Sequence, residues 1–206
     1  YRLVGSEMCI RDRLIIGSGP GGYAAAFRAA DLGREVTLVD KDPTLGGVCL
    51  NRGCIPSKTL LHIAKVLEEA ESLKKMGVTF TKPTIDIDLV RDWKNKVVSQ
   101  LSGGIGQMAK ARKVNTIQAE ATFLSDNEVQ LKSEFSTEKI TFDHCIIASG
   151  SSSTSIPGIP FDNENVLTSK TALDLEKIPK SLLVIGGGYI GLEMGTVFSA
   201  LGSSVS

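Results

Sequence analysis

Cys49 and Cys54 lie five positions apart in the run GGVCLNRGCIPSK, which extends from Gly46 to Lys58. Two thiols can exchange electrons by closing to a disulfide and opening again, and a disulfide requires its two Cα atoms to lie within about 7 Å. Residues i and i+5 of one ideal helix lie too far apart and face different directions, so we expect an irregular backbone, which Gly53 permits. A helix that begins near Pro56 would present the positive end of its dipole to Cys54 and favour a thiolate.

Two other interpretations of this cysteine pair are half of a zinc site and two inert buried thiols. The spacing is compatible with zinc, which usually takes about two to four residues between paired cysteine ligands, but a structural zinc site also needs a second ligand pair. That second pair does not occur in the sequence. A redox-active disulfide is therefore favoured, and no metal site is predicted.

A glycine-rich turn, Gly17 to Gly22, precedes the cysteine pair and fits the pattern GxGxxG. In a βαβ unit, such glycines permit a tight turn, the approach of a pyrophosphate and close packing of helix on strand, while the helix N-terminus attracts the phosphates. Asp40 follows Gly22 by eighteen residues, where a carboxylate would accept ribose hydroxyls. The sequence therefore predicts a dinucleotide site. Its predicted elements are a strand over Leu14–Ile16, a helix over Tyr23–Leu32 and a strand over Glu35–Asp40.

A second glycine loop lies towards the C-terminal end of the chain. Gly186, Gly188 and Gly191 occupy its GxGxxG positions, between a predicted buried strand over Leu182–Ile185 and a predicted helix over Tyr189–Leu201. This pattern indicates a second dinucleotide-binding unit. Its next strand, which would carry the acid that selects NAD over NADP, is expected beyond Ser206.

The elements between the two loops are predicted from periodicity and turn residues. Two helices are expected, and the second contains SGGIG, which should weaken it. Three antiparallel strands and one continuous apolar strand follow, and then a crossover rich in Ser, Gly and Pro. The helices are expected over Ser57–Met76 and Leu89–Arg112, the antiparallel strands over Asn115–Phe123, Glu128–Leu131 and Lys139–Phe142, the apolar strand over Asp143–Ala148, and the crossover over Ser149–Pro160.

Composition limits the possible partners and compartment. The 206 residues include 23 basic and 23 acidic side chains, so the formal net charge is zero and no electrostatic footprint for nucleic acid is present. No apolar run approaches the roughly 18 residues of a membrane-spanning helix. Four cysteines in a chain of this length do not form a disulfide scaffold, and nothing resembles a signal peptide. We therefore expect neither nucleic acid nor membrane as a partner, and a cytoplasmic location.

The run GGVCLNRGCIPSK after GSGPGGYAAAFRAADLG resembles the flavoprotein disulfide reductases, and its CLNxGCIPSK form is similar to the dihydrolipoamide dehydrogenases among them. The resemblance runs from about Leu14 to the last residue, which is less than half of a family member. It implies an α/β fold, in which an FAD-binding Rossmann-like domain with a central parallel sheet and an antiparallel excursion precedes the start of an NAD-binding Rossmann-like domain. The implied boundaries are 14–155 and 156–206, after a non-native leader over 1–13.

The resemblance also implies an activity and partners. The full-length enzyme would oxidise protein-bound dihydrolipoamide and pass the electrons through FAD to NAD. Its partners would be the lipoyl domains of 2-oxo acid dehydrogenase complexes, and it would be a homodimer. The family's acid–base histidine matches neither His62 nor His144, so this chain is expected to be an inactive fragment.

The resemblance assigns a role to each site residue. Cys49 would exchange with the dithiol substrate, Cys54 would contact the flavin, and Lys58 would pair with Glu193 beside it. The FAD-binding residues would be Gly17, Gly19, Pro20, Gly22, Asp40, Gly47, Ala148, Ser149 and Gly150, and the NAD-binding residues would be Gly186, Gly188 and Gly191.

Two alternatives stay open. The first is another reductase of the same superfamily, similar to glutathione or mercuric reductase. The second is a non-catalytic FAD-binding module. Cys145, in an apolar run, is expected to be an inert core thiol.

Overall fold

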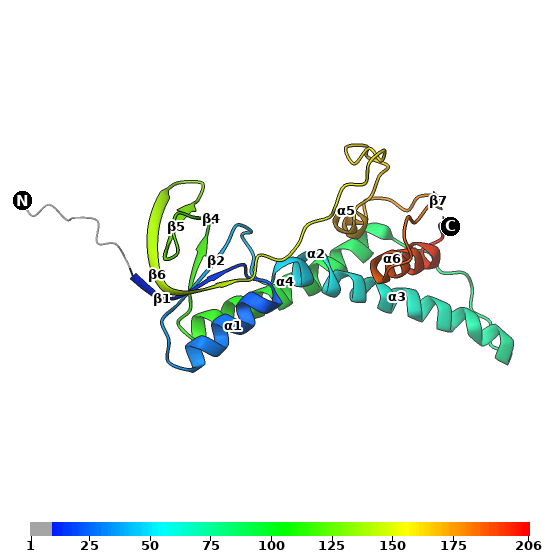
Figure 1. Cartoon of the computed structure of the whole chain (residues 1–206). Coiled ribbons are helices and arrows are strands. Elements are labelled where there is room, and N and C mark those ends of the chain that lie inside the picture. The colour runs from blue at the N-terminus through cyan, green and yellow to red at the C-terminus, as the bar shows by residue number, and fades with distance from the viewer. Residues whose placement is uncertain (1–9) are drawn as a thin grey trace, which may run out of the picture. The chain divides into compact units, whose positions relative to one another are not determined.

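The computed structural model describes residues 10–206 and separates into two compact units (Figure 1). Of the described residues, the first unit comprises 10–49 together with Leu101–Ser151, and the second comprises Leu50–Gln100 together with Ser152–Ser206. Each unit is therefore assembled from two stretches of sequence. Two of the three boundaries fall inside helices, α2 (Gly47–Arg52) and α4 (Ile87–Ala111), and the third lies between Ser151 and Ser152.

The first unit is built on a six-stranded mixed sheet in the order β3-β2-β1-β6-β5-β4. Strands β3, β2, β1 and β6 pair in parallel, and β5 and β4 extend the sheet with antiparallel pairs. Parallel neighbours need crossover connections, and α1 supplies the one between β1 and β2. The elements are β1 (Ile10–Ile16), α1 (Pro20–Asp31), β2 (Val36–Asp40), β3 (Asn115–Gln118), β4 (Glu120–Phe123), β5 (Glu128–Lys132) and β6 (Thr137–Ile147).

Strand β1 is longer than the apolar run that predicted it. It begins at Ile10 rather than Leu14, and Arg13 pairs with Val36 on one side and with His144 on the other. Ladder hydrogen bonds use only the backbone, so the polar residues before Leu14 can also pair. Residues 1–9 of the predicted leader lie outside the described part of the chain.

Two expectations for the antiparallel segment were wrong. Strand β3 pairs in parallel with β2, so it belongs to the parallel part of the sheet. The strands predicted over Lys139–Phe142 and Asp143–Ala148 are one strand, β6, which pairs with β5 through its first half and with β1 further along. The change from an alternating to a continuous apolar pattern reflects a change of neighbours and not a break in the backbone.

Two apolar clusters cover the two faces of this sheet. Leu14 and Ile15 are both fully buried, although they are consecutive and point to opposite faces. One cluster joins the sheet to α1 and the last turns of α4 through Ile15, Ala26, Val36, Leu38, Ala109 and Val114, and the other joins β1 and β2 to the antiparallel strands through Leu14, Val39, Ala119, Val129, Leu131, Ile140 and Phe142. Cys145 packs against the second cluster, and burial raises its pKa.

Helix α4 continues through the SGGIG segment, which confirms the helix predicted over Leu89–Arg112, although these glycines were expected to weaken it. Each glycine costs about 1 kcal/mol relative to alanine in a helix. Tertiary contacts offset this cost, because Ile105 and Ala109 are buried and the Ser102 hydroxyl donates to the Leu45 carbonyl at 2.6 Å.

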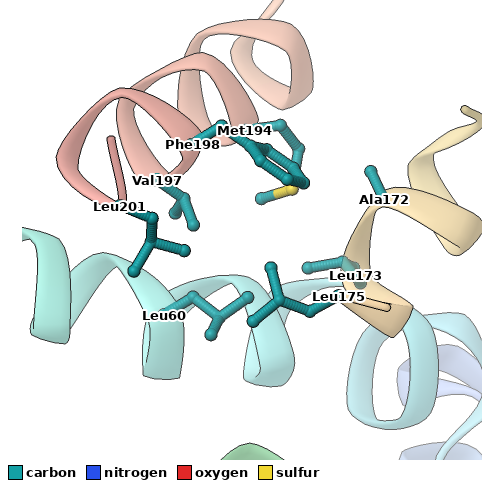
Figure 2. Packing of buried hydrophobic residues seen from close by; sticks show 8 residues of the cluster. All are labelled: Leu60, Ala172, Leu173, Leu175, Met194, Val197, Phe198 and Leu201. Carbon is teal, nitrogen blue, oxygen red and sulfur yellow. The ribbon is translucent and has the colours of Figure 1, made fainter. Parts of the chain in front are cut away.

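The second unit consists mainly of helices packed on one apolar cluster. Figure 2 shows Leu60 of α3 facing Val197, Phe198 and Leu201 of α6, with residues of α5 closing one end. The elements are α3 (Cys54–Ser72), a 3-10 turn η1 (Leu73–Met76), α5 (Ser169–Asp174), β7 (Ser181–Leu182), α6 (Tyr189–Ala200) and β8 (Ser204–Val205).

The strand predicted over Leu182–Ile185 is shorter and less buried than expected. Only Leu182 of this range lies in β7, which pairs in parallel with β8, and Leu183 and Ile185 are 70% and 65% exposed. Within the described residues β7 has β8 as its single strand neighbour.

Two basic side chains of α4 hold the C-terminal end of α5. Arg91 donates to the Leu175 carbonyl at 2.8 and 3.1 Å, and Lys94 donates to the Leu173 carbonyl at 2.5 Å. The last carbonyls of a helix have no partner within the helix, so these bonds satisfy groups that would otherwise lack one. Lys94 is only 5% exposed, and its burial lowers its pKa.

Across residues 10–206, each helix is too short or too polar to cross a bilayer.

Candidate functional site

The first glycine loop joins β1 to α1 and has no room for side chains at two positions. A Cβ on Gly17 would lie 2.1 Å from the carbonyl oxygen of Ala148, and Gly17 also has φ of +100°. A Cβ on Gly22 would lie 1.7 Å from the carbonyl oxygen of Gly17. Helix α1 begins with Pro20 at its first turn, and its N-cap residue Gly19 offers no side-chain acceptor to the first N–H groups. This arrangement suits a phosphate at the helix N-terminus.

The segment after β6 lies against the same loop. The Ala148 N–H donates to the Ile16 carbonyl at 2.7 Å, which extends the β1–β6 pairing to the point where Gly17 turns. Ser149 and Gly150 follow directly, and Gly150 has φ of +71°. The structure thus brings Ala148 and the first glycine loop together at the carboxyl ends of two neighbouring strands, which is where open α/β sheets bind ligands.

Gly47 packs its backbone on the first glycine loop. It has φ of +58°, and a Cβ there would lie 2.6 Å from the Cα of Gly19. The preceding N–H, of Gly46, donates to the Ser18 carbonyl at 2.9 Å. These contacts attach the segment just before Cys49 to the dinucleotide loop.

Asp40 ends β2 and turns its carboxylate towards the loop. One oxygen accepts from both the N–H and the hydroxyl of Ser18 at 2.6 Å, and the other accepts from the N–H of Asp42 at 3.0 Å. Sequence reasoning did not identify Ser18, which is fully buried. The sequence signal that could have identified Ser18 is a hydroxyl residue between two glycines of the loop, Gly17 and Gly19.

The two cysteines lie on two helices that meet at Gly53. Cys49 is half-buried in α2, and Cys54 is the exposed first residue of α3. Gly53 is the N-cap of α3, with φ of −150° and ψ of −110°, so the backbone is irregular between the cysteines, as expected. Helix α3 begins at Cys54, ahead of the predicted start at Ser57, and Cys54 therefore belongs to its first turn. The disulfide itself stays a prediction.

Lys58 and Glu193 form an ion pair between α3 and α6. The Lys58 Nζ lies 2.5 Å from the Glu193 Oε1, and their side chains are 59% and 21% exposed. The hydrogen bond with Glu193 raises the pKa of Lys58, and the Cys54 and Tyr189 side chains act in the same direction. The hydrogen bond with Lys58 holds the pKa of Glu193 below its ordinary value. The structure therefore places a fixed pair of opposite charges near Cys54.

The second glycine loop repeats the construction of the first. Gly186 has φ of +105°, and a Cβ on Gly191 would lie 2.6 Å from the Gly186 carbonyl oxygen. Gly188 is the N-cap of α6 and offers no side-chain acceptor to the first turn. A cavity of about 960 Å³ opens beside Gly186, Gly187 and Gly191, a volume in the range of small-molecule sites. The loop can therefore also receive a phosphate.

Across residues 10–206, no three His, Cys, Asp or Glu side chains gather closely enough to hold an ion.

Comparison with curated proteins finds relatives that share one name, dihydrolipoyl dehydrogenase. The chain is 48% identical over 192 residues to the dihydrolipoyl dehydrogenase of Vibrio cholerae, with 93% of this chain and 40% of the relative covered. It is 51% identical to that of Buchnera aphidicola subsp. Acyrthosiphon pisum, covering 93% and 41%, and 46% identical to that of Bacillus subtilis, covering 98% and 43%. The chain thus spans about 40% of the length of these relatives.

Solved structures agree with this result. The HOCl-induced flavoprotein disulfide reductase RclA from Escherichia coli matches with a TM-score of 0.80 at 27% identity, covering 94% of this chain and 41% of that one. Its Cu(II) complex matches with a TM-score of 0.81 at 29% identity, covering 96% and 42%. The family model described as "Pyridine nucleotide-disulphide oxidoreductase" matches residues 11–206. With this match over nearly the whole sequence and the two glycine loops in place, the chain belongs to the pyridine nucleotide-disulphide oxidoreductase family.

Proposed function

We propose that this chain carries the disulfide centre and both dinucleotide loops of a dihydrolipoyl dehydrogenase. The observation that carries the proposal is the Lys58–Glu193 ion pair, because it attaches the helix of the second glycine loop to the helix that begins at Cys54. The similarity to dihydrolipoyl dehydrogenases, which extends through both loops and the cysteine run, supports this choice within the family.

The reaction begins with thiol–disulfide exchange. The thiolate of a dihydrolipoyl group attacks the Cys49 sulfur of a Cys49–Cys54 disulfide, forms a mixed disulfide and releases the Cys54 thiolate. The second substrate thiol then displaces Cys49. The substrate leaves as a cyclic disulfide, and two electrons and two protons have passed to the cysteine pair. The position of Cys54 in the first turn of α3, where the helix dipole favours a thiolate, supports its role as the thiol that leaves as a thiolate and passes electrons on.

The chain's own residues fit FAD at the first loop. The N-terminus of α1 would bind the pyrophosphate. The backbone packs so closely at Gly17, Gly22 and Gly47 that only glycine fits, so no side chain stands at these positions of the loop. Asp40, with the other predicted FAD residues Pro20, Ala148, Ser149 and Gly150, would hold the rest of the nucleotide. When bound, FAD supplies the two-electron chemistry that connects the reduced cysteine pair to NAD.

The Lys58 ammonium would lie beside the flavin, and Glu193 would keep it charged and oriented. NAD would be bound at the second loop by Gly186, Gly188 and Gly191, with its phosphates at the N-terminus of α6. In the whole protein the partners would be lipoyl domains of 2-oxo acid dehydrogenase complexes, the enzyme would be a homodimer, and the location would be the cytoplasm.

Thiol counting tests the proposal. The oxidised chain is titrated with a thiol reagent before and after treatment with dihydrolipoamide, and we expect two additional thiols after treatment. Cys49→Ser and Cys54→Ser should each abolish this gain, whereas Cys145→Ser, which changes a core thiol, should leave it unchanged. A gain of zero in the unmodified chain, or a full gain in Cys49→Ser, would contradict the proposal.

A broader flavoprotein disulfide reductase is the second candidate, favoured by the similarity to the Escherichia coli reductase. The same titration with glutathione in place of dihydrolipoamide separates the two. If glutathione produces the two additional thiols as fast as dihydrolipoamide does, the broader activity is favoured.

A further inference from the structure

Ser18 is a buried residue at which three parts of the first unit meet. It lies in the first glycine loop, and its side chain is fully buried. Its N–H and its hydroxyl both donate to one oxygen of Asp40, and its carbonyl accepts from the Gly46 N–H at 2.9 Å. Ser18 therefore joins the glycine loop to the end of β2 and to the segment just before Cys49.

The bond between the Ser18 hydroxyl and the Asp40 carboxylate has the length of a charge-assisted hydrogen bond. The two oxygens lie 2.6 Å apart. Bonds from a hydroxyl to a carboxylate typically measure about 2.5–2.7 Å and are roughly twice as strong as neutral ones. A carboxylate oxygen has about two acceptor sites, and the N–H and hydroxyl of Ser18 together occupy both sites of Oδ2. Ser18 therefore restrains this oxygen from two directions.

A second contact of Asp40 is local to its own strand end. Its Oδ1 accepts from the Asp42 N–H at 3.0 Å, only two residues further along the chain. That bond moves with the end of β2, so it does not relate the carboxylate to the glycine loop. Ser18 does, because it is 22 residues away in the sequence and its backbone is bound through both its N–H and its carbonyl. Its short side chain also loses little conformational entropy when it is held in place.

We propose that Ser18 is the positioning residue of the first dinucleotide site: its hydroxyl holds the Asp40 carboxylate in the direction in which it accepts a ribose hydroxyl. The Ser18 hydroxyl is buried and acts through Asp40, without contacting the nucleotide. The acid at the end of the second strand is the usual ribose contact of such βαβ units. Recognition of the ribose rests on the proposed function, whereas the restraint of Asp40 by Ser18 can be tested in the chain alone.

A double-mutant cycle in urea unfolding tests the restraint without any ligand. The variants Ser18→Ala and Asp40→Ala and the double variant are each compared with the unmodified chain. Because the hydroxyl donates to a charged group, we expect the double variant to raise the unfolding equilibrium constant about tenfold less than the product of the two single changes. Single changes that simply multiply would overturn the proposal.

Nucleotide binding tests the direction of the carboxylate. Isothermal titration calorimetry gives the dissociation constants of ADP and of 2′,3′-dideoxy-ADP, which lacks both ribose hydroxyls. In the unmodified chain we expect ADP to bind about tenfold more tightly than the dideoxy analogue. This preference should largely disappear in Ser18→Ala, as it should in Asp40→Ala. A general disturbance of the loop would instead weaken both ligands equally and leave the preference intact.

The matched control is Ser102→Ala. Ser102 is also buried in the first unit, and its hydroxyl donates to the Leu45 carbonyl at 2.6 Å, so its loss removes a bond of the same length without touching Asp40. A preference for ADP that survives in Ser18→Ala, or that is lost equally in Ser102→Ala, would overturn the proposal. If the unmodified chain does not bind ADP, the proposed nucleotide site is wrong, and the unfolding cycle alone decides whether Ser18 restrains Asp40. Ser18→Cys, which is similar in size but a weak donor, replaces Ser18→Ala if that variant does not fold.

Discussion

The Lys58 ammonium and the Glu193 carboxylate lie 2.5 Å apart, although the two residues are 135 positions apart in the chain. Their bond connects α3 to α6 within the second unit, alongside the apolar cluster that packs the same helices. The ion pair therefore forms part of the contact between α3 and α6, and a change of pH that neutralises either residue should weaken this contact.

The ion pair predicts a pH dependence of stability at both ends of the scale. Glu193 has a lowered pKa, so its contribution is complete above the ordinary value of 4.5 and is lost as pH falls through the folded-state pKa. Lys58 has a raised pKa, so its contribution is complete below 10.5 and is lost as pH rises through the folded-state pKa. Glu193→Gln should remove the part of the pH dependence that comes from this pair, in acid and in alkali. The measurement is the free energy of unfolding in urea at pH values on either side of 4.5 and of 10.5.

The matched control for this variant is Glu71→Gln. Glu71 pairs with Lys74 at 2.5 Å on the surface near the end of α3, with both side chains well exposed. An equal flattening of the pH profile in Glu71→Gln would show that the effect is not specific to the contact between α3 and α6.

Gly22 provides a steric prediction for the first unit. In Gly22→Ala the new Cβ would lie 1.7 Å from the Gly17 carbonyl oxygen, so the loop or α1 must move. Overpacking typically costs about 1–3 kcal/mol, and backbone contacts relax less than side chains, so we expect at least the upper part of this range. Urea unfolding of the two variants Gly22→Ala and Gly21→Ala gives the measurement.

Gly21→Ala is the control because its Cβ would meet only the Ala148 Cβ, at an ordinary 3.8 Å. Its free energy of unfolding should stay the same or rise by up to about 1 kcal/mol, because alanine favours the helix over glycine. Equal destabilisation by the two substitutions would refute the steric explanation.

The burial of Lys94 predicts that its contribution to stability increases in alkali, whereas that of Lys58 decreases. Burial lowers the pKa of Lys94, with Asp174 opposing and Arg91 reinforcing this shift, so the unfolded chain binds more protons than the folded one between the lowered pKa and 10.5. The contribution of Lys94 to the free energy of unfolding should therefore increase as pH rises through this interval. In Lys94→Met this increase should disappear, whereas Lys96→Met, which changes an exposed lysine beside Trp93, should retain it. Urea titrations over the alkaline range measure both, and a slope that persists in Lys94→Met would exclude burial of this amine as its source.

Under the proposed function, replacing Asp40 should weaken the binding of FAD. The Asp40 carboxylate accepts two bonds of 2.6 Å from Ser18, so Asp40→Asn should disturb the loop as well as the nucleotide contact. Hydrogen bonds to charged groups contribute about 1.5–3 kcal/mol, so we expect the dissociation constant for FAD to rise by at least about tenfold. Quenching of flavin fluorescence measures it. Asp126→Asn, in an exposed turn, is the control, and unaltered affinity in Asp40→Asn would argue against a nucleotide role for Asp40.

The sequence predicted those features that depend on local backbone rules. The turns at Gly17 and Gly186 follow from glycines at the junction of a strand and a helix, and the irregular backbone between the cysteines follows from Gly53. Residues that depend on tertiary partners could not be found in this way. Ser18 is an ordinary small polar residue until the fold places the Asp40 carboxylate beside it.

Packing explains two further features of α4. Local propensity weakens this helix at its glycines, and the burial of Ile105 and Ala109 offsets that cost. Lys94 would be expected on the surface, and its bond to the Leu173 carbonyl at the end of α5, with the nearby Asp174 charge, makes its burial tolerable. In both cases the deciding neighbour lies far away in the sequence.

The pairing of β1 with β6 has a consequence for how the protein is made. Ile15 pairs with Ile146, so the ribosome must add most of the chain before the central ladder of the sheet can close. At about 5–20 residues per second, β1 waits on the order of ten seconds for this neighbour. During that interval β1 can pair with β2 alone, and its other edge stays open to any exposed strand. A chaperone that covers this edge should therefore raise the yield of folded protein during synthesis more than it does during refolding of the finished chain.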